Sequence, residues 1–190
     1  MRNLRSKLKR QRLVLTQDQI RHVSSRVNNL VWGLPELSRR RRLAVYMAVN
    51  GEIDCDELTE NSWLRNCSVF APVLRGRQMK FAPLNRDSRL LVNRFGIAEP
   101  ECTPQQLIRP CDLDIVIVPL LAFDSRGNRL GMGAGYYDRS FSFLRARRKW
   151  FHPKLIGVAY EFQRVRRIKL KPWDVPLNVV VTESKVYRFR

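Results

Sequence analysis

The sequence predicts an α/β fold, a single three-layer α/β/α domain over residues 1–190 with a mostly parallel central sheet. Segments rich in β-branched residues alternate along the chain with segments of helical periodicity, which is the pattern of βαβ units. The strongest strand candidate, 113–118 (LDIVIV), is almost continuously apolar. Continuous rather than alternating hydrophobicity indicates that both faces of the strand are covered, as in a parallel sheet.

Apolar spacing and helix-boundary residues set the order of the elements. Residues 1–33 are expected to be helical in two pieces, the second opened by a capping box of Thr16 and Gln19 and stopped at Gly33 and Pro35. Strands are expected at 43–49, 68–74, 78–82, 113–118, 155–160 and 178–182, with helices from 52–56 to about 65 and at 136–149.

Composition argues against a membrane protein and against a secreted one. No apolar run approaches the roughly 20 residues that span a bilayer, and no long apolar stretch or cleavage site follows the basic N-terminus. We expect a cytoplasmic protein without a membrane partner that acts as a monomer. The four cysteines include no CxxC pair, so reduced thiols are expected rather than a zinc site.

The charge is unusual for a chain of this size. There are 36 lysines and arginines against 17 acidic residues, a net charge of +19. Such an excess suits either a nucleic-acid-binding protein or an enzyme of polyanionic substrates, and charge alone does not choose between them. The basic runs at 39–42, 145–149 and 164–171 are each most simply explained as solvated surface.

A glycine-rich loop is the strongest local signal of a site. Four of the nine glycines fall between Gly127 and Gly135, between the best strand candidate and a predicted helix. Ligands of open α/β sheets bind at the carboxyl ends of strands, and glycine lets the backbone approach a phosphate closely. The loop matches neither a Walker A sequence nor GxGxxG, so an ordinary turn is the alternative. Physical arguments slightly favour phosphate, with Arg129 and Arg139 as neutralising cations.

Two aspartates qualify as ligands of Mg²⁺, which usually takes one or two carboxylates plus phosphate oxygens and water. Asp138 directly follows the glycine loop, although an aspartate in the first turn of a helix is favoured by the helix dipole in any case. Asp174 precedes the last predicted strand, and spacing alone favours a turn residue at this position.

Several motifs in a fixed order resemble the 5-formyltetrahydrofolate cyclo-ligase family, also called methenyltetrahydrofolate synthetase. The most specific segment is DIVIVPLLAFDSRGNRLGMGAGYYDR (114–139). Leu4-Arg5, YMAVNGEID (46–54), GVAYEFQ (157–163) and DVPLNVVVTE (174–183) support it, so the resemblance covers nearly the whole chain. It implies phosphoryl transfer from ATP to the formyl oxygen of 5-formyltetrahydrofolate, then attack by N10 to give 5,10-methenyltetrahydrofolate, ADP and phosphate.

The resemblance also implies roles for particular residues. ATP is expected at Met1, Arg2, Asn3, Leu4 and Arg5, chiefly through Arg2 and Arg5, and at the loop residues Arg129, Leu130, Gly131, Met132, Gly133, Ala134, Gly135, Tyr136 and Tyr137. Arg129 is expected to be catalytic, Asp138 and Asp174 to face Mg²⁺, and Met47, Glu52 and Tyr136 to bind folate. The two tyrosines offer flat faces to pterin or adenine, and core packing is the alternative for either.

The sequence departs from the family pattern at a few of these positions. Met1 stands where a lysine is often found, Met132 and Ala134 replace frequent Arg, Lys or Gly, and Asn178 replaces a frequent Asp. The missing cation in the loop makes stabilisation of the transition state depend more on Arg129 and Mg²⁺. Two alternatives remain open: an RNA-binding protein on the same fold, and a kinase or ligase for another small acid. The excess charge is further compatible with a polyglutamylated folate.

Overall fold

In the computed structural model, the described residues are 2–38, 42–146 and 152–189, apart from the side chain of Arg2. Met1, residues 39–41 of the first basic run and residues 147–149 of the second lie outside the described residues. The expectation that Met1 and the side chain of Arg2 bind ATP therefore stays a prediction from the sequence.

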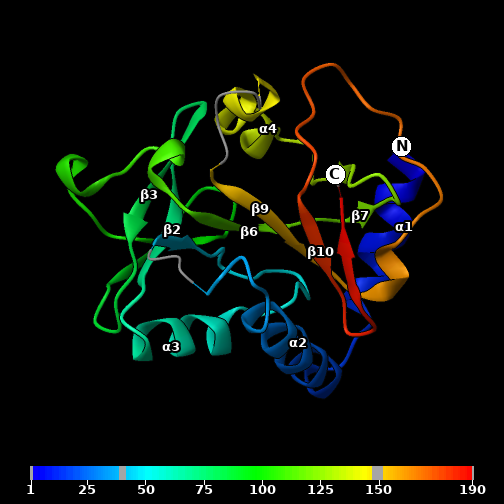
Figure 1. Ribbon diagram of the computed structural model, residues 1–190, viewed down its shortest axis with the longest axis horizontal. Helices are drawn as coiled ribbons and strands as arrows, with labels where there is room; N and C mark the ends of the chain where they lie inside the picture. The colour runs from blue at the N-terminus through cyan, green and yellow to red at the C-terminus, as the bar shows by residue number, and fades with distance from the viewer. Residues whose placement is uncertain (1, 39–41, 147–151, 190) are drawn as a thin grey trace.

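A seven-stranded sheet crosses the middle of the described chain, in the order β11-β10-β9-β6-β1-β2-β3 (Figure 1). Neighbours within β10, β9, β6, β1 and β2 are parallel, whereas the outer strands β11 and β3 pair antiparallel. The predicted α/β class with a mostly parallel sheet is confirmed. The strands are β1 Arg42–Ala44, β2 Ser68–Arg75, β3 Gln78–Pro83, β6 Ile115–Pro119, β9 Lys154–Val158, β10 Val179–Val181 and β11 Val186–Arg188.

Helices cover both faces of this sheet. The helices α2 (Gln17–Trp32) and α3 (Asp56–Leu64) lie below it in Figure 1, and α4 (Tyr136–Ser140) with the 3₁₀ turn Ser142–Ala146 lies above. On β6, Ile115 and Ile117 join the core cluster on the α2–α3 side, whereas Val116 and Val118 join the cluster on the α4 side. This two-sided burial explains why the strand is continuously apolar.

The N-terminal helix α1 (Arg2–Leu13) packs apart from these layers, against the hairpin of β7 (Ala122–Phe123) and β8 (Arg129–Leu130). Leu8 of α1 is buried with Ala122, Leu130 and Ile168. The loop after β9 that carries Ile168 thus runs beside α1, as Figure 1 shows in orange. Helix α2 begins with the predicted capping box, in which Thr16 and Gln19 each bond the other's backbone N–H.

Two predicted elements are shorter than expected. The strand predicted at 43–49 pairs only as Arg42–Ala44. The chain then leaves the sheet and turns at Asn50 and Gly51, both with positive φ. The helix predicted at 136–149 is the five-residue α4 followed by a 3₁₀ turn, and its last residues lie outside the described part. The short α4 supplies only a weak helix dipole at its N-terminus.

Several small elements were not predicted. These are β11, the β7–β8 hairpin, and a second hairpin of β4 (Leu90–Val92) and β5 (Ala98–Pro100). Single 3₁₀ turns occur at Pro104–Gln106, Pro110–Asp112 and Glu161–Gln163. Among the described helices, none has the length and apolarity that crossing a membrane requires.

Candidate active site

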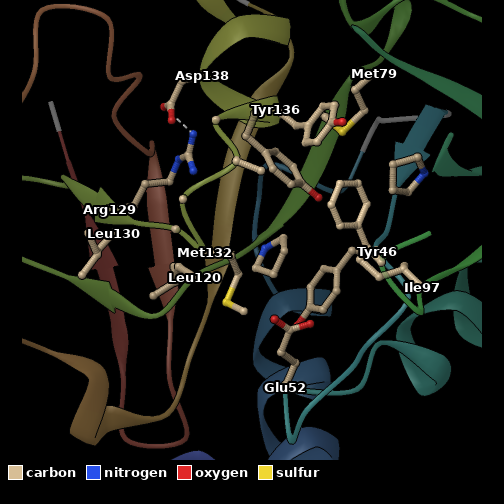
Figure 2. Close-up of a pocket in the computed structure, with 18 of the residues that line it drawn as sticks. Tyr46, Glu52, Met79, Ile97, Leu120, Arg129, Leu130, Met132, Tyr136 and Asp138 are labelled. Atoms are coloured by element: carbon tan, nitrogen blue, oxygen red, sulfur yellow. Dashed lines mark hydrogen bonds and ion pairs between the residues drawn. The ribbon is translucent and has the colours of Figure 1, made fainter. Parts of the chain in front are cut away.

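A cavity of about 440 Å³ opens beyond the carboxyl ends of β1 and β6. Tyr46 and Met47, which follow β1, and Pro119 and Leu120, at the end of β6, line its floor. This is where ligands bind in open α/β sheets. Figure 2 shows the pair Arg129–Asp138 at one end of the cleft and Glu52 with Tyr46 at the other, with Met132 between them.

The glycine loop forms one wall of the cleft, which every residue from Arg129 to Asp138 lines. Its backbone takes positive φ at Gly133 (117°) and Gly135 (69°), where a side chain would be strained. At Gly135 an added Cβ would also lie 2.8 Å from Nη1 of Arg139, which donates a hydrogen bond to Ala134 O at 2.8 Å. Arg5 of α1 holds the start of the loop, because its Nε donates to Gly131 O at 3.0 Å. The loop is thus fixed by two arginines, one at each end.

Arg129 is a buried arginine at the edge of the cleft. Its Nη2 lies 2.6 Å from Asp138 Oδ1, and its guanidinium stands over the ring of Tyr137 at 5.6 Å. Burial lowers the pKa of Arg129, and the negative charge of Asp138 opposes that shift. Its Nε is buried without a hydrogen-bond partner among the described residues. A buried donor of this kind is costly unless a ligand satisfies it.

The two aspartates expected at a metal both line the cleft. Asp138 Oδ1 accepts from Arg129 and, at 3.2 Å, from the backbone N–H of Val175, which directly follows Asp174. Asp174 closes a turn, since its Oδ2 accepts from the N–H of Lys171 at 2.9 Å. Asp174 is therefore the turn residue that its spacing suggested, and it also lines the cleft. No cluster of three or more His, Cys, Asp or Glu with metal-site geometry occurs within the described residues.

Glu52 lies at the opposite end of the cleft with only 7% of its side chain exposed. Its Oε1 is 3.3 Å from Nη1 of Arg12, and its Oε2 accepts from the N–H of Val49 at 3.2 Å. Burial raises the pKa of Glu52 above its ordinary value, and the charge of Arg12 opposes the rise. Met47 and Tyr136, the other two residues predicted to bind folate, also line the cleft, Tyr136 from the glycine loop.

The two tyrosines of the loop have different surroundings, although both line the cleft. Tyr136 donates to Gly76 O at 3.1 Å and meets the ring of Phe95 edge-on at 6.2 Å. Tyr137 is stacked on Phe141, with ring centroids 6.1 Å apart, and burial raises the pKa of its hydroxyl. Core packing therefore explains much of the burial of the Tyr137 ring, whereas Tyr136 bridges the loop and the β4–β5 hairpin.

The predicted N-terminal ATP residues do not all reach the cleft. Arg5 lines it, whereas Asn3 is exposed away from it and Leu4 packs against the Leu8 cluster. Asn3 and Leu4 do not line the cleft in the structure, and their predicted contact with ATP stays a prediction. Because α1 is a helix, the side chains of successive residues point in different directions, which explains why Arg5 lines the cleft and Leu4 does not.

Two further parts of the wall were missed by the sequence reasoning. The β4–β5 hairpin contributes Asn93, Phe95, Ile97 and Glu99, and the region after β9 contributes Lys169, Lys171 and Trp173. Lys9 of α1 also lines the cleft, and Arg12 supports it from behind Glu52. The hairpin carries no alternating pattern to reveal it, because Leu90, Leu91 and Val92 are all exposed. The basic run 164–171 was the one available signal for the lysines.

Fold and site together define a small α/β enzyme whose cleft joins a glycine-rich, arginine-held loop to a buried carboxylate. The chain belongs to the 5-formyltetrahydrofolate cyclo-ligase family, whose model matches residues 1–183. It is therefore an enzyme of the ligase class.

Curated relatives cover nearly the whole chain. The 5-formyltetrahydrofolate cyclo-ligase of Escherichia coli K12 is 32% identical over 187 residues, which is 96% of this chain and 100% of that protein. The cyclo-ligase of Haemophilus influenzae is 34% identical over 177 residues, or 92% of each chain.

Solved structures have the same fold. The Aquifex aeolicus 5,10-methenyltetrahydrofolate synthetase matches with a TM-score of 0.83 and 34% identity, covering 99% of this chain and 92% of that one. The Mycoplasma pneumoniae synthetase matches with a TM-score of 0.74, covering 96% of this chain and 98% of that one. At 23% identity this match bears on the fold alone.

Proposed function

We propose that the enzyme converts 5-formyltetrahydrofolate to 5,10-methenyltetrahydrofolate and releases ADP and phosphate from ATP. The observation that carries the proposal is that a single cleft holds both the glycine loop with the Arg129–Asp138 pair and the buried carboxylate of Glu52. Family membership supports it independently. A kinase or ligase for a different small acid would have no use for the buried carboxylate of Glu52 at its end of the cleft.

The reaction has two balanced steps. The formyl oxygen attacks the γ-phosphorus of ATP, the bond to ADP breaks, and the formyl carbon becomes electrophilic. N10 then attacks that carbon, the carbon–oxygen bond breaks with departure of phosphate, and N10 gives up its proton. Both steps need alignment and charge stabilisation rather than a protein nucleophile. The cleft supplies these through the loop backbone and the cations Arg5, Lys9 and Arg129.

Arg129 is the residue that we propose to stabilise the charge that develops on the transferred phosphoryl group. The ion pair with Asp138 fixes its guanidinium at the cleft, and its unpartnered Nε is a donor that a phosphate oxygen would satisfy. A preoriented cation costs no reorganisation during the reaction. Met132 and Ala134 bring no further charge into this loop.

The residues present fit a Mg²⁺ ion. Asp138 and Asp174 are two carboxylates at the same edge of the cleft beside the proposed phosphate loop, which matches the usual donor set of one or two carboxylates plus phosphate oxygens and water. Among the described residues, the bonds to Asp138 all go to Oδ1, which leaves Oδ2 for such a ligand. A bound Mg²⁺ would neutralise charge on the phosphates.

At the folate end, Glu52 is placed to accept hydrogen bonds from N–H groups of the pterin. Tyr46 beside Glu52, and Ile97 and Met79 on the side of the cleft away from Arg129, give apolar surfaces against which a flat ring can pack (Figure 2). A buried carboxylate amid apolar side chains binds a ligand that donates hydrogen bonds to it more tightly than one that does not.

Mixing the purified chain with 5-formyltetrahydrofolate, ATP and Mg²⁺ should produce the absorbance band of the methenyl product, with one ADP formed for each product molecule. Omitting ATP or chelating the metal should abolish the signal. Folded protein that forms no methenyl product with folates of any glutamate length would refute the proposal.

Eight exposed cations lie on α1 and on the segment after β9 that runs beside it, and we refer to them together as the basic face: Lys7, Lys9, Arg10, Arg164, Arg166, Arg167, Lys169 and Lys171. Of these, Lys9, Lys169 and Lys171 line the cleft. None of the eight is paired with a carboxylate of the described residues. The second half of the face is held in place because Ile168 N–H donates to Asp124 Oδ2 at 2.9 Å and Val165 N–H to Phe123 O at 2.8 Å. We propose that this face receives the additional carboxylates of polyglutamylated folates.

A triglutamate substrate should therefore have a KM severalfold below that of the monoglutamate at low salt, because exposed ion pairs each contribute about 0.2–1 kcal/mol. The advantage should shrink at 0.15 M salt, where the Debye length is about 8 Å. Arg166→Glu/Arg167→Glu should remove it, whereas the matched control Arg21→Glu/Arg26→Glu on α2 should not. Equal KM values at low salt, or tight binding of RNA to this face with no effect of the glutamate tail, would contradict the assignment.

A further inference from the structure

Helix α1 makes polar contacts with both ends of the cleft. Arg5 and Arg12 are seven residues apart, which places them on one side of the helix about 10 Å apart along its axis. Nε of Arg5 donates to Gly131 O in the glycine loop at 3.0 Å. Nε of Arg12 donates to Asn50 O at 2.9 Å, and its Nη1 lies 3.3 Å from Glu52. Leu8 lies between them and anchors the helix in the cluster with Leu130.

Arg12 and Glu52 form an almost fully buried ion pair, with 1% and 7% of their side chains exposed. Arg12 is also the most buried of the basic residues of α1, whose other described cations are exposed or half-exposed. Removing one partner of such a pair leaves an uncompensated buried charge, which is strongly unfavourable. Burial already raises the pKa of Glu52, and the charge of Arg12 is the largest influence that lowers it.

The turn that carries Glu52 is seated directly on the end of α1. Asn50 and Gly51 have positive φ, and an added Cβ at Gly51 would lie 2.8 Å from Arg12 O. On its other side, Tyr160 donates from its hydroxyl to Gly51 O at 3.0 Å. The backbone that precedes Glu52 is therefore held between Arg12 and Tyr160. Both the location of Glu52 and its charge thus depend on α1.

We propose that Arg12 is a positioning residue for the folate subsite, because it places a positive charge against Glu52 and directs that carboxylate into the cleft, and that α1 sets the spacing between this carboxylate and the glycine loop. The inference rests on the proposed function for the identity of the ligand, and on the Arg12–Glu52 contact for everything else. Arg12 lies behind Glu52 and does not line the cleft itself. Its effect on folate is therefore exerted through Glu52.

Arg12→Met tests the proposal without dependence on turnover. Titration of carboxyl-labelled glutamate by NMR, in the ligand-free protein, should show the pKa of Glu52 rising in Arg12→Met and staying near its original value in Arg12→Lys. Arg26→Met, at an exposed cation on α2 outside the basic face, is the matched control and should leave that pKa unchanged. An unchanged pKa of Glu52 in Arg12→Met would overturn the proposal, whether or not the protein binds folate.

Binding measurements give the second readout. Arg12→Met should raise the Kd of 5-formyltetrahydrofolate tenfold or more and that of a non-hydrolysable ATP analogue by less than twofold, with Arg12→Lys recovering most of the folate affinity. In a Glu52→Gln background, Arg12→Met should add little, because both buried charges are then gone. That double variant also guards against misfolding of Arg12→Met. Equal losses for both ligands, or an undiminished effect in the Glu52→Gln background, would overturn the positioning role, whereas a wild-type protein that binds no folate would instead refute the proposed function.

Discussion

Replacing Asp138 with asparagine should lower turnover by about a hundredfold or more while the protein stays folded, since lost stabilisation of transition-state charge typically has this size. The amide keeps the shape of the side chain but cannot neutralise Arg129 at 2.6 Å or hold a divalent cation against the phosphates. Turnover should be measured as methenyl formation across a range of Mg²⁺ concentrations, with circular dichroism as the check on folding.

Asp18→Asn is the matched control for Asp138→Asn. Asp18 stands in the first turn of α2 as Asp138 does in the first turn of α4, but it is exposed and remote from the cleft. If Asp138 serves only its helix, the two variants should behave alike. Near-normal turnover of Asp138→Asn at limiting Mg²⁺ would show that its carboxylate has no part in the reaction. Rescue by excess Mg²⁺ would support the metal role over the positioning of Arg129.

Glu52→Gln should weaken binding of 5-formyltetrahydrofolate far more than binding of an ATP analogue. A hydrogen bond to a charged group contributes about 1.5–3 kcal/mol, so the folate Kd should rise roughly ten- to a hundredfold. The ATP analogue binds at the other end of the cleft in our assignment and should lose little. Calorimetry on both ligands measures the difference, with the exposed Glu57→Gln of α3 as control. Equal effects on the two ligands would contradict the assignment.

The same carboxylate predicts a pH dependence. Burial raises the pKa of Glu52, so its charged form, which accepts the pterin hydrogen bonds, is lost as pH falls through that raised value. Folate affinity should therefore decline at a higher pH than the titration of an exposed glutamate would produce. In Glu52→Gln this part of the pH dependence should vanish. Its persistence would assign the titration to another group, of the folate or of the protein.

The sheet was predictable because burial on both faces leaves a continuous apolar run, as in 113–118. The same rule failed after Ala44. Residues 45–49 are apolar because they pack under α2 and line the cleft, not because they pair as a strand. Local composition does not distinguish these two reasons for burial. The Asn50-Gly51 pair was the available sign of an early turn, since both residues take positive φ.

The site was predictable where sequence motifs are contiguous and hidden where partners are distant. The loop from Arg129 to Asp138 is one segment, so its presence at the cleft followed from its place after the best strand. Arg12 is one of many cations in a basic helix, and its partner Glu52 lies 40 positions later, so no local pattern distinguishes it. Its spacing of seven from Arg5 is the faint signal that both face the same side of the helix.

The fate of the formyl oxygen tests the central claim most directly. With 5-formyltetrahydrofolate labelled with ¹⁸O in its formyl group, in unlabelled water with ATP and Mg²⁺, mass spectrometry of the released phosphate should find one labelled oxygen for each methenyl product. This result follows if the formyl oxygen attacks the γ-phosphate in the cleft between Arg129 and Glu52. Unlabelled phosphate, with the label recovered in water, would mean that ATP hydrolysis and ring closure are separate events and would contradict the mechanism proposed for this enzyme.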